Sequence, residues 1–376
     1  MSTNWNGGSV NCTEEKAPEK PATGDRIGRA RMMLSASDVE GILFFGGPNI
    51  RYLTGFTGTD GVLLLGGDHL ALLVDGRYTT QAKEETRGCA IVEFSDRPDG
   101  VAGAIADLGM ERVGVESAAV TLDSYLALRK RAPGVDFKPL SEEIERLRII
   151  KEGGEAALIR EAARRAARAL TETLEEIRPG VTEQEVVAIL EMKMRQAGGE
   201  GPSFETIVAS GPNAALPHAT PGSRGIGAGD FVTIDYGTIW GGYHSDETCT
   251  IAVGRVTERQ AAVYAVVKEA HDRTIDAVRE GISCRDIDAV ARGYIDRAGY
   301  GPHFAHGTGH GVGLEIHEPP RLSGRSNDIL EAGMVVTVEP GIYLPGMWGV
   351  RIEDTVLVEK DGCEILTKMS KDLKIL

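Results

Sequence analysis

An internal duplication in the second half of the chain constrains its fold more than any other feature. The segment RPGVTEQEVVAILEMKMRQAG begins at Arg178, and the segment REGISCRDIDAVARGYIDRAG begins at Arg279, 101 positions later. Both read as the end of a long helix, a glycine, a capping residue and a second helix that stops at glycine. Internal repeats are sought before any other fold assignment, because they decide how the units pack. We expect one pseudo-two-fold domain with a site at the seam between its halves.

The duplication continues through the β-rich stretch that follows each helix pair. FVTIDYG (231–237) matches VVTVEPG (335–341) at an offset of 104, and SDET (245–248) matches IEDT (352–355) at an offset of 107. The hydrophobic period predicts long helices over 155–177 and 257–280. Thr182 with Glu185, and Ser283 with Asp286, have the spacing of caps that open the second helix of each copy. Residues 153–376 are therefore predicted to form two helix–helix–hairpin units.

The amino-terminal part reads as a small, separate α/β domain. Two apolar runs, 61–65 and 70–74, flank Gly66-Gly67-Asp68 and predict a hairpin. Further strands are expected over 41–45 and 113–115, and helices over 78–85 and 121–130. A chain of 376 residues is long enough for two domains. We predict the following division: a disordered tail over 1–22, this α/β domain over 24–138, a charged helical linker over 139–152 and the duplicated domain over 153–376.

Composition excludes several classes of partner. The formal net charge of −15 argues against a sequence-independent hold on nucleic acid. No run approaches the roughly 18 apolar residues of a membrane-spanning helix, and the polar first residues lack the apolar core of a secretory signal. The five cysteines are scattered, with no Cys-x-x-Cys. We expect no nucleic-acid or membrane partner and a cytoplasmic location, where thiols stay reduced.

Each copy of the repeat carries two carboxylates on neighbouring strands, Asp235 with Asp246 and Glu339 with Glu353. A single acidic residue at a strand end is more often a turn or helix cap. Four at matching points of a repeat are different, because buried carboxylates repel one another and take up protons unless cations compensate them. Two divalent ions would balance the four negative charges. The pattern predicts metal binding at the seam.

Histidine is the second signal of a site. His303, His306, His310 and His317 fall within 15 residues, in a stretch too rich in glycine for a helix. The glycines do not make a phosphate-binding loop, since no Gly-Lys-Ser/Thr follows. A ligand set of oxygens with one imidazole suits Mn²⁺, Co²⁺, Fe²⁺ or Zn²⁺. Two such ions close together can generate a hydroxide near neutral pH, which indicates hydrolytic chemistry.

Five phrases of residues 153–376 together resemble the pita-bread metallopeptidases. They are IDYG, YHSDETCTIAVG, HGTGHGVGLEIHE, TVEPGIY and VRIEDT. The resemblance implies a metal-ligand set of Asp235, Asp246, His310, Glu339 and Glu353. It also implies that Glu339 shuttles a proton, that His218, His306 and His317 act in catalysis and substrate binding, and that Arg351 binds substrate. Cys249 departs from the family pattern, which often has arginine there, but it is not a ligand position.

The amino-terminal part resembles the first domain of Xaa-Pro peptidases, in ILFFGGPNIRYLTGFTGTDGVLLL and ALLVDGRYTTQAKEE. The overall expectation is an α+β protein, with a creatinase-like α/β domain before a pita-bread (creatinase/aminopeptidase) domain. The phrases TGFTGTDG and DGRY favour the aminopeptidase P branch.

The resemblance therefore predicts an Xaa-Pro aminopeptidase that acts through a metal-bridging hydroxide. It implies two divalent ions per chain, with Mn²⁺ favoured over Co²⁺, Zn²⁺ and Fe²⁺, and a homodimer that acts on proline-containing peptides. Three alternatives stay open. They are an Xaa-Pro dipeptidase (prolidase), in which Arg351 meets the free carboxylate of a dipeptide, a methionine aminopeptidase, and a non-catalytic binding module of the same fold.

Overall fold

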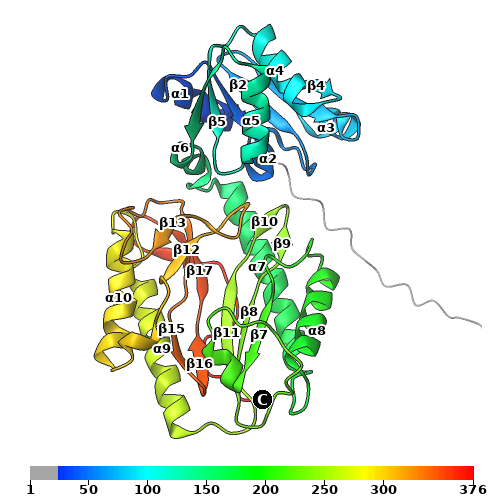
Figure 1. Ribbon diagram of the computed structural model, residues 1–376. Helices are drawn as coiled ribbons and strands as arrows, with labels where there is room; N and C mark the ends of the chain where they lie inside the picture. Colours follow the sequence, from blue (N-terminus) through cyan, green and yellow to red (C-terminus); the bar gives the residue numbers. More distant parts are fainter. Residues whose placement is uncertain (1–23) are drawn as a thin grey trace, which may run out of the picture.

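The computed structural model describes residues 24–376, and the predicted disordered tail lies outside the described residues. Figure 1 shows two bodies, with the smaller amino-terminal one above the larger one that carries the chain end. Within residues 24–376, no helix combines the length and the apolar character needed to cross a bilayer.

The amino-terminal body is a six-stranded sheet with strand order β4-β3-β2-β1-β5-β6. The predicted hairpin is confirmed, since β2 and β3 pair antiparallel, whereas β3–β4, β1–β5 and β5–β6 are parallel. Its strands are β1 Gly41–Phe44, β2 Val62–Gly66, β3 Leu70–Asp75, β4 Ala90–Phe94, β5 Arg112–Glu116 and β6 Asp136–Leu140. Its helices are α1 Gly24–Ala36, α2 Gly47–Thr54, α3 Thr79–Glu85, α4 Arg97–Asp107 and α5 Leu122–Arg131. Helices α1, α2 and α4 and strands β4 and β6 were not predicted from the sequence.

The segment between the two bodies is helical only in short pieces. It contains α6 Glu142–Glu145 and the single 3₁₀ turn η1 Arg146–Arg148. Lys151 then pairs with Glu318, and Arg148 lies 3.4 Å from the same carboxylate, with all three side chains buried. The segment is thus anchored to the second body by buried ion pairs.

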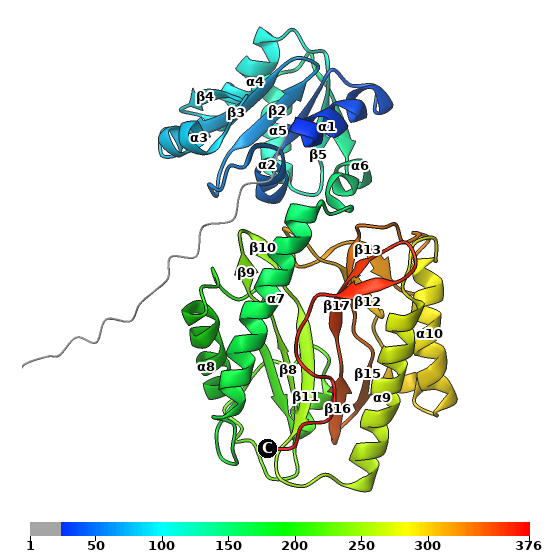
Figure 2. The ribbon, with the colours of Figure 1, turned by 180° about the vertical axis from the view of Figure 1, so that it is seen from behind.

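The larger body repeats one arrangement twice. The first copy contains α7 Gly153–Leu174, α8 Glu183–Gln196, β7 Ile207–Ser210, η2 Gly211–Ala215, β8 Phe231–Tyr236, β9 Ile239–Trp240, β10 Tyr243–His244 and β11 Glu247–Ala252. The second contains α9 Glu258–Ala277, α10 Cys284–Arg297, η3 Gly301–His303, β12 Gly309–Gly311, β13 Glu318–Leu322, β14 Val335–Val338, β15 Gly341–Leu344, β16 Trp348–Arg351, β17 Asp354–Val358 and β18 Cys363–Ile365. Figures 1 and 2 show α7 with α8 on one flank, α9 with α10 on the other, and strands between them.

The helix boundaries follow the predicted signals. Thr182 and Glu185 form a capping box at the start of α8, and Ser283 accepts a hydrogen bond from the backbone of Asp286 at the start of α10. Each of these helices ends before a glycine with positive φ, 91° at Gly198 and 86° at Gly299. Only glycine adopts that conformation without strain, so the two glycines stop equivalent helices at equivalent points.

The two copies meet where β11 of the first lies against β16 and β17 of the second. The first copy holds a three-stranded sheet, β11-β8-β7, and the second a five-stranded sheet, β13-β12-β14-β17-β18. At the seam the backbone nitrogen of Glu353 donates to the carbonyl of Thr248 at 3.1 Å. The apolar faces of the sheets pack under the helices, with Val186, Leu190 and Ile234 fully buried. The residues at the seam are therefore fixed from both sides.

Candidate metal centre

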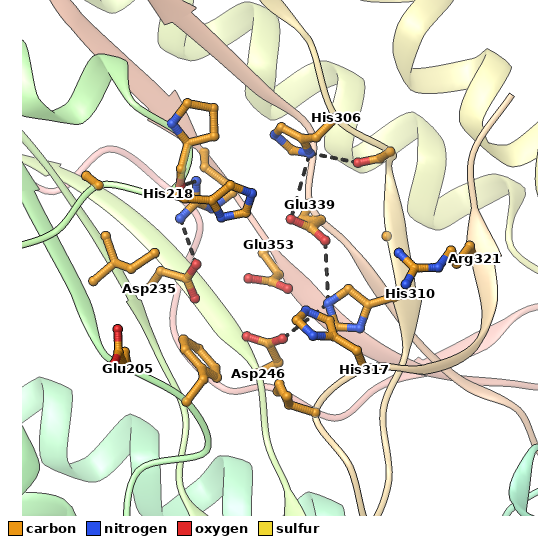
Figure 3. A pocket seen from close by; sticks show the side chains of 18 of the residues that line it. Glu205, His218, Asp235, Asp246, His306, His310, His317, Arg321, Glu339 and Glu353 are labelled. Carbon is orange, nitrogen blue, oxygen red and sulfur yellow. Dashed lines mark hydrogen bonds and ion pairs between the residues drawn. The ribbon is translucent and has the colours of Figure 1, made fainter. Parts of the chain in front are cut away.

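The five predicted metal ligands lie at strand ends along the seam. Asp235 is in β8, Asp246 directly precedes β11, and His310 is the middle residue of β12. Glu339 follows β14, and Glu353 directly precedes β17. Figure 3 shows the five side chains directed at one central space. The backbone approaches closely here, because a Cβ at Gly309 would collide with the carbonyl oxygen of Thr337, which explains one glycine of the histidine-rich segment.

Three of these residues form a compact group. Potential ligand atoms of Asp246, His310 and Glu353 all lie within 4.8 Å of one another, and all three residues are buried. Nε2 of His310 is 3.5 Å from the Asp246 carboxylate and 3.6 Å from that of Glu339. Nδ1 of His310 lies 2.9 Å from the carbonyl oxygen of Gly311, to which it donates in the neutral ring. That hydrogen bond leaves the Nε2 lone pair facing the carboxylates, the orientation that a metal ligand requires.

Asp235 has a different environment. Its Oδ2 accepts a hydrogen bond of 2.7 Å from Arg351, whereas its Oδ1 is buried and accepts none from any described residue. A buried carboxylate oxygen without a partner is costly unless a cation meets it. Asp235 is therefore suited to hold a second cation beside the compact group.

The electrostatics of the centre also fit divalent cations. Burial raises the pKa of Asp246 well above its usual range, and the charges of Glu353 and Asp235 raise it further. Burial likewise raises the pKa of Glu353, and it raises the pKa of Glu339 to about 7. Burial lowers the pKa of His310 to about 4, so its ring is neutral and able to act as a ligand. Acids that resist ionisation beside a neutral imidazole make a cluster that bound cations would stabilise.

The three further predicted histidines all line the same cavity, which has a volume of about 550 Å³. His306 donates from Nδ1 to the carbonyl of Gly307 at 2.8 Å, and its Nε2 accepts from the Tyr343 hydroxyl at 2.8 Å. The ring of His317 packs edge-on against His310, with centroids 4.4 Å apart. Burial lowers the pKa of His317, and the Arg321 charge adds to that effect. No residue among 24–376 forms a hydrogen bond to the ring nitrogens of His218 or His317, which leaves both rings open to a ligand.

Arg351 is a buried residue in the wall of the same cavity. Besides Asp235, its guanidinium contacts the Tyr343 hydroxyl at 2.9 Å, the Pro217 carbonyl at 3.1 Å and the Thr248 hydroxyl at 3.2 Å. Its pKa is raised despite burial, because Tyr343 and Asp235 favour the charged form. The structure thus brings Arg351 into contact with a predicted ligand, and its predicted role in substrate binding stays a prediction.

Sequence reasoning missed several groups around the centre. The Thr248 hydroxyl donates to Glu353 at 2.6 Å, and Tyr343 links His306 to Arg351. Arg321 and Glu205 line the cavity with opposite charges, and none of the described residues forms an ion pair with Arg321 (Figure 3). Thr248 had a signal, since a residue two positions after Asp246 shares its face of a strand. Tyr343 and Arg321 had none, because their contacts are non-local.

Comparisons with known proteins agree with this arrangement. The model of metallopeptidase family M24 matches residues 157–360, and that of the creatinase/prolidase N-terminal domain matches residues 26–150. The Xaa-Pro dipeptidase of Pyrococcus horikoshii is 37% identical over 93% of this chain and 98% of that protein. A solved Xaa-Pro dipeptidase from Bacillus anthracis is 42% identical, with a TM-score of 0.92 over 94% of this chain and 100% of that one. A solved X-Pro aminopeptidase from Thermotoga maritima is 34% identical, with a TM-score of 0.87 over the same shares of 94% and 100%. The expected two-part fold is confirmed.

Proposed function

The chain belongs to metallopeptidase family M24, with a creatinase/prolidase N-terminal domain, and we propose that it acts as an Xaa-Pro dipeptidase. It is a hydrolase that uses divalent metal ions. Several relatives are named Xaa-Pro dipeptidase or prolidase, and this favours the dipeptidase alternative over the aminopeptidase branch expected from TGFTGTDG and DGRY. The aminopeptidase stays a second candidate, because the solved relative from Thermotoga maritima carries that name.

One observation carries the proposal: a cationic side chain, Arg321, faces the cavity of the candidate centre and has no ionic partner among residues 24–376. A dipeptide ends in a carboxylate directly after proline, whereas a longer peptide continues as an amide. Arg321 lies near His317 and His310, since its charge contributes to lowering the pKa of both. We assign it to the substrate carboxylate, the part that the resemblance gave to Arg351.

The ligand set in the proposal is Asp235, Asp246, His310, Glu339 and Glu353, holding two divalent ions of which Mn²⁺ is favoured. Oxygens with one imidazole suit Mn²⁺, and equally Co²⁺, Fe²⁺ or Zn²⁺. When bound, such ions supply Lewis acidity that polarises the scissile carbonyl and lowers the pKa of water. Arg351 and Thr248 orient the ligand carboxylates through the hydrogen bonds described above.

The remaining catalytic roles, proton transfer and substrate binding, are assigned to Glu339 and to the histidines around the ligands. Glu339 takes the proton of the attacking water and delivers it to the proline nitrogen, which has no hydrogen of its own and leaves as an amine only when protonated. His306 lies 4.0 Å from Glu339 and is held by Tyr343, so its ring is placed to act on the substrate beside that carboxylate. His218 and His317, whose ring nitrogens are open to the cavity, contact the substrate backbone.

The remaining parts of the proposal concern the assembly and location of the protein. We propose a homodimer that acts on proline-containing peptides in the cytoplasm. Cys89, Cys249, Cys284 and Cys363, the cysteines of the described part, are free thiols, as a reducing compartment requires. Sedimentation equilibrium of the purified protein tests the dimer, and cell fractionation tests the location.

Substrate length decides between the two candidate activities. We expect a higher kcat/KM for Met-Pro than for Met-Pro-Gly and for Met-Pro-amide, which lack the carboxylate after proline. Arg321→Gln should lower kcat/KM for Met-Pro about 10- to 100-fold, the effect of losing a charged hydrogen bond, and should change the tripeptide value far less. Arg297→Gln, an exposed arginine on α10, is the matched control and should change neither. Faster cleavage of the tripeptide would make the protein an aminopeptidase, and an unchanged ratio in Arg321→Gln would remove Arg321 from the account.

A further inference from the structure

A second cluster of buried charges lies on the side of the ligand strands that faces away from the cavity. In each copy the predicted ligand is followed directly by another carboxylate, Glu247 after Asp246 and Asp354 after Glu353. Glu247 opens β11 and Asp354 opens β17. Because successive side chains of a strand point to opposite faces, the ligands face the cavity while Glu247 and Asp354 face away from it. Neither of these two lines the cavity.

One lysine joins the two carboxylates. Nζ of Lys371 contacts Oε1 of Glu247 and lies 3.2 Å from Oδ1 of Asp354. The exposed fractions of the three side chains are 6% for Lys371, 1% for Glu247 and 6% for Asp354, so water does not screen the contacts. Lys371 therefore ties the strand of the first copy to the strand of the second.

Further polar contacts hold each carboxylate in place. Glu247 accepts from the Tyr236 hydroxyl at 2.8 Å and from the backbone nitrogen of Met369 at 2.9 Å. On the other side, Oδ2 of Asp354 lies 3.2 Å from Nε2 of His271 in α9. The cluster thus draws on both copies of the repeat and on the chain after β18.

The segment that carries Lys371 is docked along β11. The backbone nitrogen of Ala252 donates to the carbonyl of Lys374 at 2.9 Å, and that of Leu376 donates to the carbonyl of Ala252 at 2.9 Å. Figure 2 shows this last segment crossing the strands on the side where α7 and α9 lie. The backbone contacts fix Lys371 in position independently of its side chain.

On the cavity side the same two strands are joined directly at the ligands. The Thr248 hydroxyl donates to the Glu353 carboxylate, and the Thr355 hydroxyl donates to the carbonyl of Asp246 at 2.7 Å. The distance between Asp246 and Glu353 therefore depends on how β11 and β17 are held against each other. Lys371 contacts the residue that directly follows each of these two ligands in the sequence.

We propose that Lys371 is a positioning residue for the metal centre, which sets the spacing of Asp246 and Glu353 by tying together the strands behind them. The inference rests on the proposed ligand set. A buried ion pair is weak evidence for a role in stability, because its desolvation cost offsets its attraction. Lys371 contacts the residues next to two ligands, so its role is to position those ligands. Loss of a residue that orients metal ligands typically weakens metal binding about 10- to 100-fold.

The test compares metal binding in four full-length variants with that of the wild-type protein. Lys371→Met removes the charge, Lys371→Arg keeps it, and Leu190→Ala removes buried apolar surface at α8 and changes none of the charged residues of the cluster. Asp246→Asn removes a proposed ligand. Mn²⁺ affinity is measured by calorimetric titration of the metal-free proteins, and ligand geometry is measured from the visible spectrum of the Co²⁺ forms.

We expect Lys371→Met to bind Mn²⁺ about 10- to 100-fold more weakly and to give an altered Co²⁺ spectrum. Lys371→Arg should restore both, and Leu190→Ala should lower the melting temperature while leaving both unchanged. If Lys371→Met does not fold, the pair Glu247→Gln with Lys371→Met, which leaves no unpaired carboxylate at position 247, takes its place with the same expectation.

Two outcomes overturn the inference: wild-type affinity and spectrum in Lys371→Met or its replacement, or an equal loss of affinity in Leu190→Ala. Failure of the ligand set is a separate result. It would appear as unchanged Mn²⁺ binding in Asp246→Asn, whereas failure of the inference alone leaves Asp246→Asn defective and Lys371→Met normal.

Discussion

Replacing Glu339 by glutamine should stabilise the metal-free protein at high pH and destabilise the metal-loaded one. Burial raises the pKa of Glu339 to about 7, with a further contribution from Asp235, against the opposing effects of Arg351 and the Thr337 hydroxyl. The free side chain has a pKa of about 4.3. The folded protein therefore holds the Glu339 proton more tightly than the unfolded chain. The protonated Glu339 side chain makes its full contribution to the free energy of unfolding below about pH 4. That contribution is lost as the pH rises through about 7.

The magnitude follows from the separation of the two pKa values. The carboxyl has a pKa of about 7 in the folded protein and about 4.3 in the unfolded chain. Its ionisation lowers the free energy of unfolding by about 3–4 kcal/mol over that interval. Glutamine has nearly the same shape and never ionises, so the variant escapes this loss. His306 and His310, with pKa values of about 4, act in the opposite direction, because their lowered values add stability as the pH rises to about 6.5. They are present in both proteins, so the difference between variant and wild type isolates Glu339.

The assay is urea unfolding of both proteins with chelator at pH 5 and pH 8, repeated at pH 8 with saturating Mn²⁺. Without metal, we compare the free energy of unfolding of Glu339→Gln with that of the wild type at each pH. The difference should shift in favour of the variant by about 3 kcal/mol between pH 5 and pH 8. With Mn²⁺ the order should reverse, since the variant lacks one proposed ligand and gains less from binding. An unfolding difference that is the same at both pH values would refute the buried-acid reasoning. A metal-loaded variant as stable as the wild type would refute the ligand role.

Three more variants test single contacts of the centre. Arg351→Met should lower the free energy of unfolding of the metal-free protein by about 3 kcal/mol, because it leaves the largely buried carboxylate of Asp235 unpaired, and a loss under 1 kcal/mol in chemical denaturation would contradict the pairing. His317→Gln should lower kcat about 10²- to 10⁴-fold with metal content intact, and near-normal turnover in steady-state kinetics would exclude a role for this ring. Thr248→Val removes the hydroxyl that donates to Glu353 and should weaken Mn²⁺ binding about 10- to 100-fold by calorimetry, whereas wild-type affinity would show that the hydroxyl does not orient the ligand.

The sequence predicted the duplicated domain better than the first one. Its long amphipathic helices, their caps and the terminal glycines at Gly198 and Gly299 are local signals that the structure bears out. In the first domain β6 was missed because its sequence, DFKPL, contains a proline, which a sheet tolerates only at an edge, and β6 is indeed the edge strand. The charged run after it favours a helix by propensity, yet buried pairing of Arg148 and Lys151 with Glu318 leaves only short helical pieces.

The site divides in the same way into what is local and what is not. The matching carboxylates of the repeat and the glycine-rich histidine segment predicted the residues of the candidate centre, because both features can be read along the chain. Other contacts of the site cannot be read in this way. Arg351 meets Asp235, and Lys371 meets Glu247, across more than 100 positions of the chain. The Tyr343 hydroxyl meets Arg351 across the paired strands of a hairpin. No period or motif encodes such contacts. The proposed preference for dipeptides is of this kind too, since it rests on Arg321 in the cavity and not on the amino-terminal phrases.

Hydrolysis of Met-Pro by the metal-free protein, followed during stepwise addition of Mn²⁺, tests the central claim most directly. The account predicts no turnover in chelator and a rise that reaches its plateau at two equivalents of Mn²⁺ per chain. Asp246→Asn should fail to reach that plateau, because it lacks a side chain of the compact group of Asp246, His310 and Glu353. Full turnover in chelator would contradict the account, and so would a plateau that Asp246→Asn reaches as readily as the wild type.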